Sequence, residues 1–195
     1  MPGPLIRAAG RRDAMDLVAF IDMASEGFAS WFWSTIAAPG QSRIEIGRSR
    51  ALRDEATFSW RNARIAEIDG TPAGGLVGYP FGEGPTADEI AAMPPFLKQI
   101  AALEALVPHH WYVNVLAVHP EFRGQGVGRA LLRDADRLAA ATPTRGMAII
   151  VADENVPALR LYEAVGYRIL DRRTLVPYPG YERTGDWMLL TKPRG

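Results

Sequence analysis

The sequence predicts a mixed α/β fold that contains one sheet and several helices. Two observations predict it. Apolar residues recur with a helical period in some segments and form short continuous or alternating runs in others. In chain order the segments are strand, helices, hairpin, a helical region, then strand, helix, strand, helix, strand, strand, which is neither a Rossmann alternation nor a helix bundle. With 195 residues, 48% of them hydrophobic, the chain is expected to form a single domain over 1–195.

The first half of the chain is expected to hold a strand, helices and a hairpin. In order these are a strand at 4–9, a helix at 12–27, an aromatic segment at 28–33 (FASWFW), a short charged helix at 43–53, strands at 60–69 and 72–80, and helices at 86–93 and 96–106. The pair Asp69-Gly70 is a hairpin signal between the two strands. The pair Pro94-Pro95 forces a break between the last two helices.

The second half alternates strands and helices more regularly. It is expected to contain a strand at 111–118, a helix at about 126–141, a strand at 147–152, a helix at 155–166, and strands at 167–173 and 186–192 with a loop between them. Asn155 suits the N-cap of the second helix, and Gly166 suits its end.

Composition and charge exclude several classes of function. The formal net charge is zero, which does not favour a nucleic-acid binder. The chain has no run of eighteen apolar residues and no basic, apolar leader at its start, so neither a membrane span nor a signal peptide is expected. It has no cysteine, which fits a reducing compartment, and we expect the cytoplasm. Its three histidines lack metal-site spacing, so no metal is expected.

Three glycines within five positions, in the run AVHPEFRGQGVGRALL (117–132), mark the junction between a strand and a helix. A glycine-rich loop at a helix start offers backbone N–H groups and the positive helix end to an anion, which predicts a phosphate cradle. A P-loop is excluded because no Lys-Ser/Thr pair follows. A dinucleotide loop is excluded because its third glycine would fall on Arg129 or Leu131. The remaining pattern is Arg123-x-x-Gly126-x-Gly128.

This pattern resembles the pyrophosphate-binding motif of the GCN5-related N-acetyltransferase (GNAT) family, Gln/Arg-x-x-Gly-x-Gly/Ala. A second segment, ENVPALRLYEAVGY, is similar to the family's later landmark, with an Asn, a Tyr seven residues on and a Gly-aromatic pair. The resemblance implies a mostly antiparallel sheet of six to seven strands flanked by helices and splayed between the parallel strands 111–118 and 147–152. It also implies a coenzyme-binding core over about 110–170 and an acceptor side over about 1–106.

The implied activity is transfer of an acetyl group from acetyl-CoA, as co-substrate, to a primary amine of a small molecule or peptide. The resemblance implies direct attack within a ternary complex. The chain offers no cysteine for an acyl-enzyme and no G-x-S-x-G elbow. The sequence does not name the acceptor, and a homodimer remains open.

Coenzyme contacts are implied along the strand, the loop and the second landmark. The residues are Leu116, Ala117, Val118, Arg123, Gly124, Gln125, Gly126, Val127, Gly128, Arg129, Asn155 and Tyr162. The strand is expected to pair with the pantetheine arm through its backbone. Tyr162 is implied to protonate the departing thiolate, and it lies two helical turns after Asn155, on the same face.

The general base stays open. Family members that carry a base on the strand before the loop have it at the places that hold Tyr112 and Asn114 here, and neither is an ordinary base at neutral pH. His110 continues that strand face by alternation and has a suitable intrinsic pKa. The remaining options are a carboxylate on another loop, such as Glu26 or Glu83, or a water relay through Tyr112 and Asn114.

Two other classes of function compete with catalysis. The chain could be a non-catalytic acyl-CoA sensor of the same fold, although Tyr162 argues against this. It could also be a nucleotide-binding oxidoreductase in which Asp153 imitates a ribose-binding acid, but the broken dinucleotide motif counts against that reading.

Overall fold

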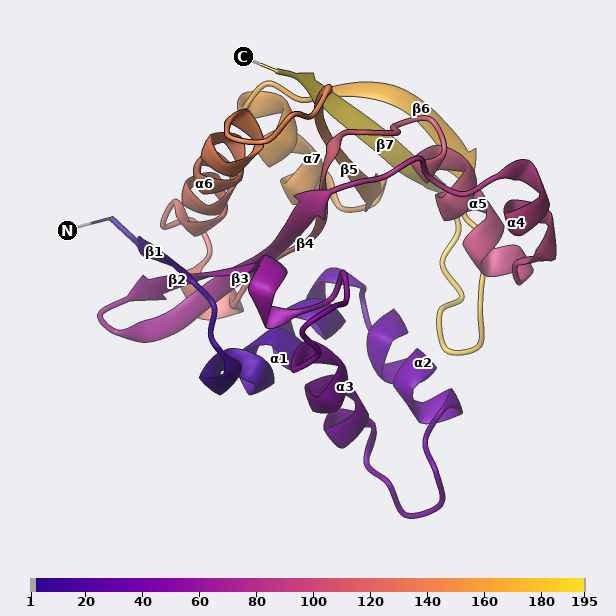
Figure 1. Cartoon of the computed structure of the whole chain (residues 1–195), viewed down its shortest axis with the longest axis horizontal. Coiled ribbons are helices and arrows are strands. Elements are labelled where there is room, and N and C mark those ends of the chain that lie inside the picture. The colour runs from indigo at the N-terminus through magenta and orange to yellow at the C-terminus, as the bar shows by residue number, and fades with distance from the viewer. Residues whose placement is uncertain (1–2, 195) are drawn as a thin grey trace. The chain divides into compact units, whose positions relative to one another are not determined.

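A computed structural model describes residues 3–194 of the chain (Figure 1). The helices and strands, in order, are β1 (Leu5–Ala8), α1 (Ala14–Ala24), α2 (Phe28–Thr35), α3 (Arg43–Ala51), β2 (Ala63–Ile68), β3 (Thr71–Pro80), α4 (Ala87–Ala92), α5 (Pro95–Glu104), β4 (Trp111–Val118), α6 (Val127–Ala140), β5 (Gly146–Ala152), α7 (Val156–Ala164), β6 (Arg168–Thr174) and β7 (Asp186–Pro193). The strands form one seven-stranded sheet in the order β1-β2-β3-β4-β5-β7-β6. The predicted fold class is confirmed, because β4 and β5 are parallel whereas β1-β2-β3 and β5-β7-β6 pair antiparallel.

The chain divides into two compact units. The first runs up to Tyr79 and includes Asn114–Ala135, and the second comprises Pro80–Val113 and the chain from Asp136 onward. The prediction of a single domain is not tested by this division. None of the helices within 3–194 is both long enough and apolar enough to cross a membrane.

In the first unit, a three-stranded antiparallel ribbon packs with three helices. The hairpin between β2 and β3 turns at Asp69 and Gly70, both with positive φ, as a type I′ turn requires. Helix α1 buries one stripe, which includes Leu17 and Phe20. The Phe20 ring occupies the space where Gly75 of β3 lacks a Cβ, so a side chain at Gly75 would collide with it. Helices α1, α2 and α3 contact one another (Figure 1).

In the second unit, β5 lies between β4 and β7, and β6 forms the sheet edge. Its core includes Leu103, Tyr167, Leu189 and Leu190, each fully buried. Helix α5 packs against β6 and β7. Helix α7 ends at the predicted glycine. Gly166 adopts φ +101, and the Tyr167 N–H donates to the Tyr162 carbonyl at 3.0 Å, which closes the last turn.

Two local predictions were incomplete. The aromatic segment 28–33 lies in helix α2, which sequence inspection left without an element. Bulky aromatic residues are mediocre helix formers, but burial of Trp33 and Ala29 decides the conformation here. The strand predicted at 60–69 begins only at Ala63, because Trp60–Asn62 form a 3₁₀ turn capped by the buried Ser59 hydroxyl, which accepts from the Arg61 N–H at 3.2 Å.

The parallel pairing of β4 with β5 is short. It joins Trp111–Val113 to Met147–Ile149, whereas the two strands run on to Val118 and Ala152. Strands bonded along their full length would have contradicted the predicted splay, and these are not. The coenzyme cleft expected there stays a prediction.

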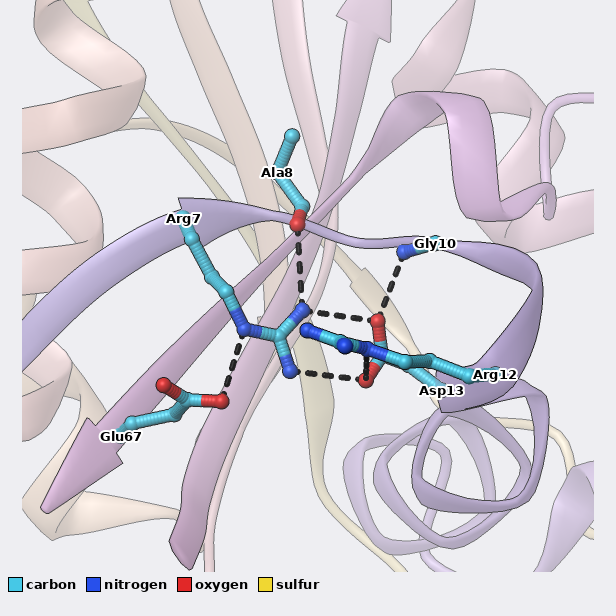
Figure 2. A network of polar contacts seen from close by, with 6 residues as sticks. All are labelled: Arg7, Ala8, Gly10, Arg12, Asp13 and Glu67. Carbon is cyan, nitrogen blue, oxygen red and sulfur yellow. Dashed lines mark hydrogen bonds and ion pairs between the residues drawn. The ribbon is translucent and has the colours of Figure 1, made fainter. Parts of the chain in front are cut away.

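Arg7 is the centre of a charged network that ties β1 to the start of α1 and to β2 (Figure 2). Its guanidinium donates to both carboxylate oxygens of Asp13 at 2.8 Å and to Glu67 at 2.7 Å. The Asp13 carboxylate also accepts from the Gly10 N–H at 2.6 Å. Asp13 is buried, and the hydrogen bond from Arg7 is the largest cause that lowers the pKa of its carboxyl below the usual range.

Replacing Asp13 with Asn should destabilise the protein by about 2 kcal/mol, because the charge-assisted hydrogen bonds to Arg7 lose their anion. Urea unfolding measures this. Since the folded-state pKa of Asp13 is lowered, the advantage of the wild type is complete above its ordinary value of 3.8 and should shrink as the pH falls below it. The matched control is Asp54→Asn, which removes an exposed carboxylate paired with Arg61 and should change stability by less than about 1 kcal/mol. Equal losses for both variants would contradict the assignment.

Candidate functional site

The glycine loop joins β4 to α6 within the first unit. After Val118 a 3₁₀ turn spans Pro120–Phe122, and Gly124 and Gly126 follow with φ of +77 and +81. These are left-handed conformations that favour glycine. A Cβ at either position would meet no atom within 4 Å, so glycine is required there by backbone conformation and the space beside the loop is open.

Free backbone donors lie at the start of α6. The first bond of the helix runs from the Ala130 N–H to the Gly126 carbonyl at 3.0 Å. The N–H groups of Gly126, Val127, Gly128 and Arg129 therefore have no acceptor within the helix. Together with the positive helix end they form a surface suited to an anion such as a phosphate. Val127 is buried and anchors this turn, whereas Gly126 and Arg129 are exposed.

Two side chains of the loop brace it instead of extending away from it. The Arg123 Nε donates to the Val118 carbonyl at 3.2 Å, and the Gln125 amide donates to the Glu121 carbonyl at 3.1 Å. The positive charge of Arg123 therefore lies beside the end of β4. Its predicted contact with a coenzyme remains a prediction.

The last residues of β4 alternate in burial. Ala117 is buried, whereas Leu116 and Val118 are half-buried on the other face. A Cβ on Gly74 of β3 would lie 2.7 Å from the Ala117 carbonyl oxygen, so the two backbones approach closely at this point only because Gly74 has no side chain. The predicted pairing of this strand with a pantetheine arm remains a prediction.

Asn114 stands on the same face of β4 as Leu116. Its amide nitrogen donates to the Tyr79 hydroxyl at 2.8 Å, and both residues belong to the first unit. An amide cannot accept a proton at neutral pH, so Asn114 could orient a substrate or water but could not serve as a base. Tyr79 is a neighbour of the site that sequence inspection missed, because nothing in its strand pattern marks it.

Tyr162 belongs to the second unit, on α7. Asn155 caps this helix, and its side-chain oxygen accepts from the Ala158 N–H at 3.3 Å. The Tyr162 ring is buried and lies 6.0 Å from the ring of Tyr167. Within residues 3–194 its hydroxyl forms no hydrogen bond. Burial raises the pKa of Tyr162 above its ordinary 10, so the phenol stays protonated at neutral pH.

His110 and Tyr112 also belong to the second unit, at the start of β4. The His110 Nδ1 lies 3.1 Å from the Pro108 carbonyl, so this nitrogen carries a proton and Nε2 is the basic atom of a neutral ring. Tyr112 is buried, with its ring 5.4 Å from that of Phe81.

A carboxylate that the sequence did not single out lies beside Tyr112. Glu104 is the last residue of α5. Burial raises the pKa of the Glu104 carboxyl, and hydrogen bonding with Tyr112 opposes that effect only in part. By contrast, the side chain of Glu83 is exposed and lies 3.2 Å from His109. No sequence pattern indicates the contact of Glu104, because it joins a helix end to a strand across a turn.

Comparison with solved structures identifies the fold. A crystal structure described as an acetyltransferase is 18% identical with a TM-score of 0.68, and the match covers 98% of this chain and 100% of that one. An N-acetyltransferase from Staphylococcus aureus Mu50 is 17% identical with a TM-score of 0.62, covering 96% and 99%. A putative acetyltransferase from Salmonella typhimurium, solved with its cofactor acetyl-CoA, is 18% identical with a TM-score of 0.61, covering 100% and 95%. At these identities the likeness establishes the fold alone.

The sequence itself carries the family relationship. The glycine loop and the segment around Tyr162 correspond to the two landmarks from which membership was predicted. The model of the acetyltransferase (GNAT) family matches residues 26–167, well over half of the chain, and the chain therefore belongs to the GNAT acetyltransferase family.

Proposed function

We propose that this protein transfers the acetyl group of acetyl-CoA to a primary amine of a small molecule or peptide. The observation that carries the proposal is the loop Arg123-x-x-Gly126-x-Gly128, with Gly126 at φ +81 directly before the free N–H groups of α6. Family membership supports acetyl transfer in general, and the loop supports the coenzyme as its source.

The loop holds the pyrophosphate in this proposal. The N–H groups of Gly126, Val127, Gly128 and Arg129 donate to its oxygens, and the Arg129 side chain adds charge. The backbone of Leu116, Ala117 and Val118 aligns the pantetheine arm, and Asn155 contacts it from the other landmark. The amine nitrogen then attacks the thioester carbon, and the carbon–sulfur bond breaks to release the coenzyme as a thiolate.

Tyr162 stabilises the departing sulfur in this proposal. Its hydroxyl has no partner within residues 3–194 and is available to a ligand. Because burial raises the pKa of the phenol above 10, whereas a thiol titrates near about 8.5, complete proton transfer to the thiolate is uphill. Tyr162 therefore acts mainly by donating a hydrogen bond to sulfur, and solvent completes the protonation.

A panel of amines tests the proposal, with release of the free coenzyme thiol as the measurement. At least one primary amine should be acetylated, and the product should carry one acetyl group on nitrogen. Coenzyme A should raise the melting temperature and NAD should not, which separates this function from an oxidoreductase. Binding of coenzyme A without turnover of any amine would favour the sensor alternative.

Gly126→Val should weaken acetyl-CoA binding at least tenfold, about 1.4 kcal/mol. The valine side chain would project into the open space where a phosphate is expected, and the left-handed backbone would be strained. Gly40→Val is the matched control, because Gly40 has the same φ of +81 and equally open surroundings in a turn between α2 and α3. It should show the backbone strain without the loss of affinity. Unchanged affinity in a folded Gly126 variant would remove the loop from the coenzyme site.

Tyr162→Phe should lower kcat by about tenfold to a thousandfold, towards the lower end, with little change in KM for acetyl-CoA. Because the pKa of Tyr162 is raised, the phenol does not titrate near neutrality, and the loss should be the same factor from about pH 6 to 9. The control is Tyr167→Phe, which removes a hydroxyl from the neighbouring buried ring and should leave kcat intact. Full activity of the Tyr162 variant would show that the departing sulfur does not need the Tyr162 hydroxyl and would remove Tyr162 from the catalytic residues.

A further inference from the structure

An open hydrogen-bond acceptor stands on β4, in the same unit as the glycine loop. We propose that the Asn114 side-chain oxygen accepts a hydrogen bond from the acceptor amine, and that this contact selects primary amines over secondary ones. The inference rests on the proposed function and deepens it by giving a reason for the class of amine. It makes Asn114 a specificity-determining residue and Tyr79 the residue that positions it.

The Asn114 amide is oriented by a neighbouring strand. Its nitrogen donates to the hydroxyl of Tyr79, near the end of β3, at 2.8 Å. Tyr79 is buried, so its hydroxyl offers the amide a fixed partner. Since the nitrogen and the oxygen of an amide point in different directions, a bond that fixes the nitrogen also fixes the direction of the oxygen.

The Asn114 oxygen is available to a ligand. It takes part in no hydrogen bond within residues 3–194. It is also not one of the buried side-chain atoms that lack a partner there, so it is open to solvent although Asn114 as a whole is half-buried. A partly enclosed polar atom that the chain itself leaves unused suits the task of orienting a small ligand.

The position of Asn114 along β4 suits the reacting end of the coenzyme. The parallel ladder with β5 joins Trp111–Val113 to its partners, and Asn114 is the next residue of β4. Between its phosphate and its sulfur, the pantetheine arm has about as many bonds as the backbone of four residues in an extended chain. Asn114 lies four residues before Val118, the last residue of the strand. An arm whose phosphate lies at the loop and which follows β4 therefore brings its thioester close to Asn114.

The hydrogens on the amine give the physical reason for the selection. A primary amine carries two hydrogens when its lone pair attacks the thioester carbon, and the amide product keeps one of them. Asn114 holds the hydrogen that stays, while the other leaves as a proton and balances the proton that the thiolate finally takes up. A secondary amine has one hydrogen, which must leave. An N-methyl acceptor therefore ends with the Asn114 oxygen facing a methyl group, without a hydrogen bond.

The selectivity of Asn114→Leu provides the main test, because leucine is close to asparagine in size but accepts no hydrogen bond. The substrates are the amine that the panel identifies and its N-methyl analogue. The wild type should prefer the primary amine in kcat/KM, and the variant should lose about tenfold of that preference. KM for acetyl-CoA should stay within about twofold, because the contacts proposed for the coenzyme are left in place.

Asn114→Ala separates the hydrogen bond from crowding. Under the proposal, the alanine and leucine variants lose the preference to the same extent. If the N-methyl group is rejected only for lack of space, the alanine variant should accept it and the leucine variant should still reject it, which would overturn the inference. An unchanged preference in both variants would also overturn it. The matched control is Asn62→Ala, which removes an amide of the same unit that donates to the Ala56 and Thr57 carbonyls at 3.1 Å, and it should leave the preference unchanged.

Tyr79→Phe tests the positioning role. It keeps the ring, removes the hydroxyl that the amide nitrogen contacts, and should lower the preference for the primary amine by about threefold. In an Asn114→Leu background the same change should have no further effect on the preference, because Tyr79 acts through Asn114. Equal losses in both backgrounds would overturn the positioning role. Failure of the whole amine panel would overturn the proposed function and this inference with it, whereas an active panel with an unchanged preference would overturn this inference alone.

Discussion

The left-handed backbone at Gly124 and Gly126 is the constraint on which the candidate coenzyme site depends. It turns the chain from β4 into α6 so that the first N–H groups of the helix are left without carbonyl partners. A close-packed contact beneath the loop supports this turn: Gly74 of β3 lacks the side chain that would collide with the Ala117 carbonyl and with Val127. Glycine therefore serves two separate physical purposes here, conformation in the loop and close approach below it. A charged side chain could not replace the backbone donors, because they are oriented by the helix itself.

Much of the fold could be predicted from the sequence because its elements are locally encoded. The turn at Asp69-Gly70, the Asn155 cap and the Gly166 stop each follow from one or two residues, and each is found as expected. Helix α2 was missed because its conformation depends on a tertiary contact. A Cβ on Gly47 of α3 would lie 2.6 Å from the Trp33 ring, so a glycine within one helix makes room for an aromatic residue of another. Neither segment reveals that partnership by itself.

The candidate site also has one part that could be predicted from the sequence and another that could not. The glycine loop is a contiguous motif, and its conformation agrees with what the motif requires. The groups that would handle protons are not contiguous, and what each can do depends on its neighbours. Burial keeps the Tyr162 phenol protonated, which suits a hydrogen-bond donor. Burial also raises the pKa of the Glu104 carboxyl. Neither effect can be read from residue type, because each depends on what surrounds the side chain.

The three base candidates in β4 or directly before it differ most in what they contact. The Pro108 carbonyl holds a proton on Nδ1 of His110, which leaves Nε2 of the neutral ring as the atom that could accept a proton. Asn114 donates to the Tyr79 hydroxyl, and a phenol does not accept a further proton at neutral pH. Tyr112 carries a phenol, whose ordinary pKa of about 10 makes it a poor base at neutral pH unless a partner takes its proton. Of these three positions, only His110 has a side chain whose ordinary chemistry lets it take a proton near neutral pH, and its hydrogen bond to a carbonyl fixes which ring nitrogen would do so.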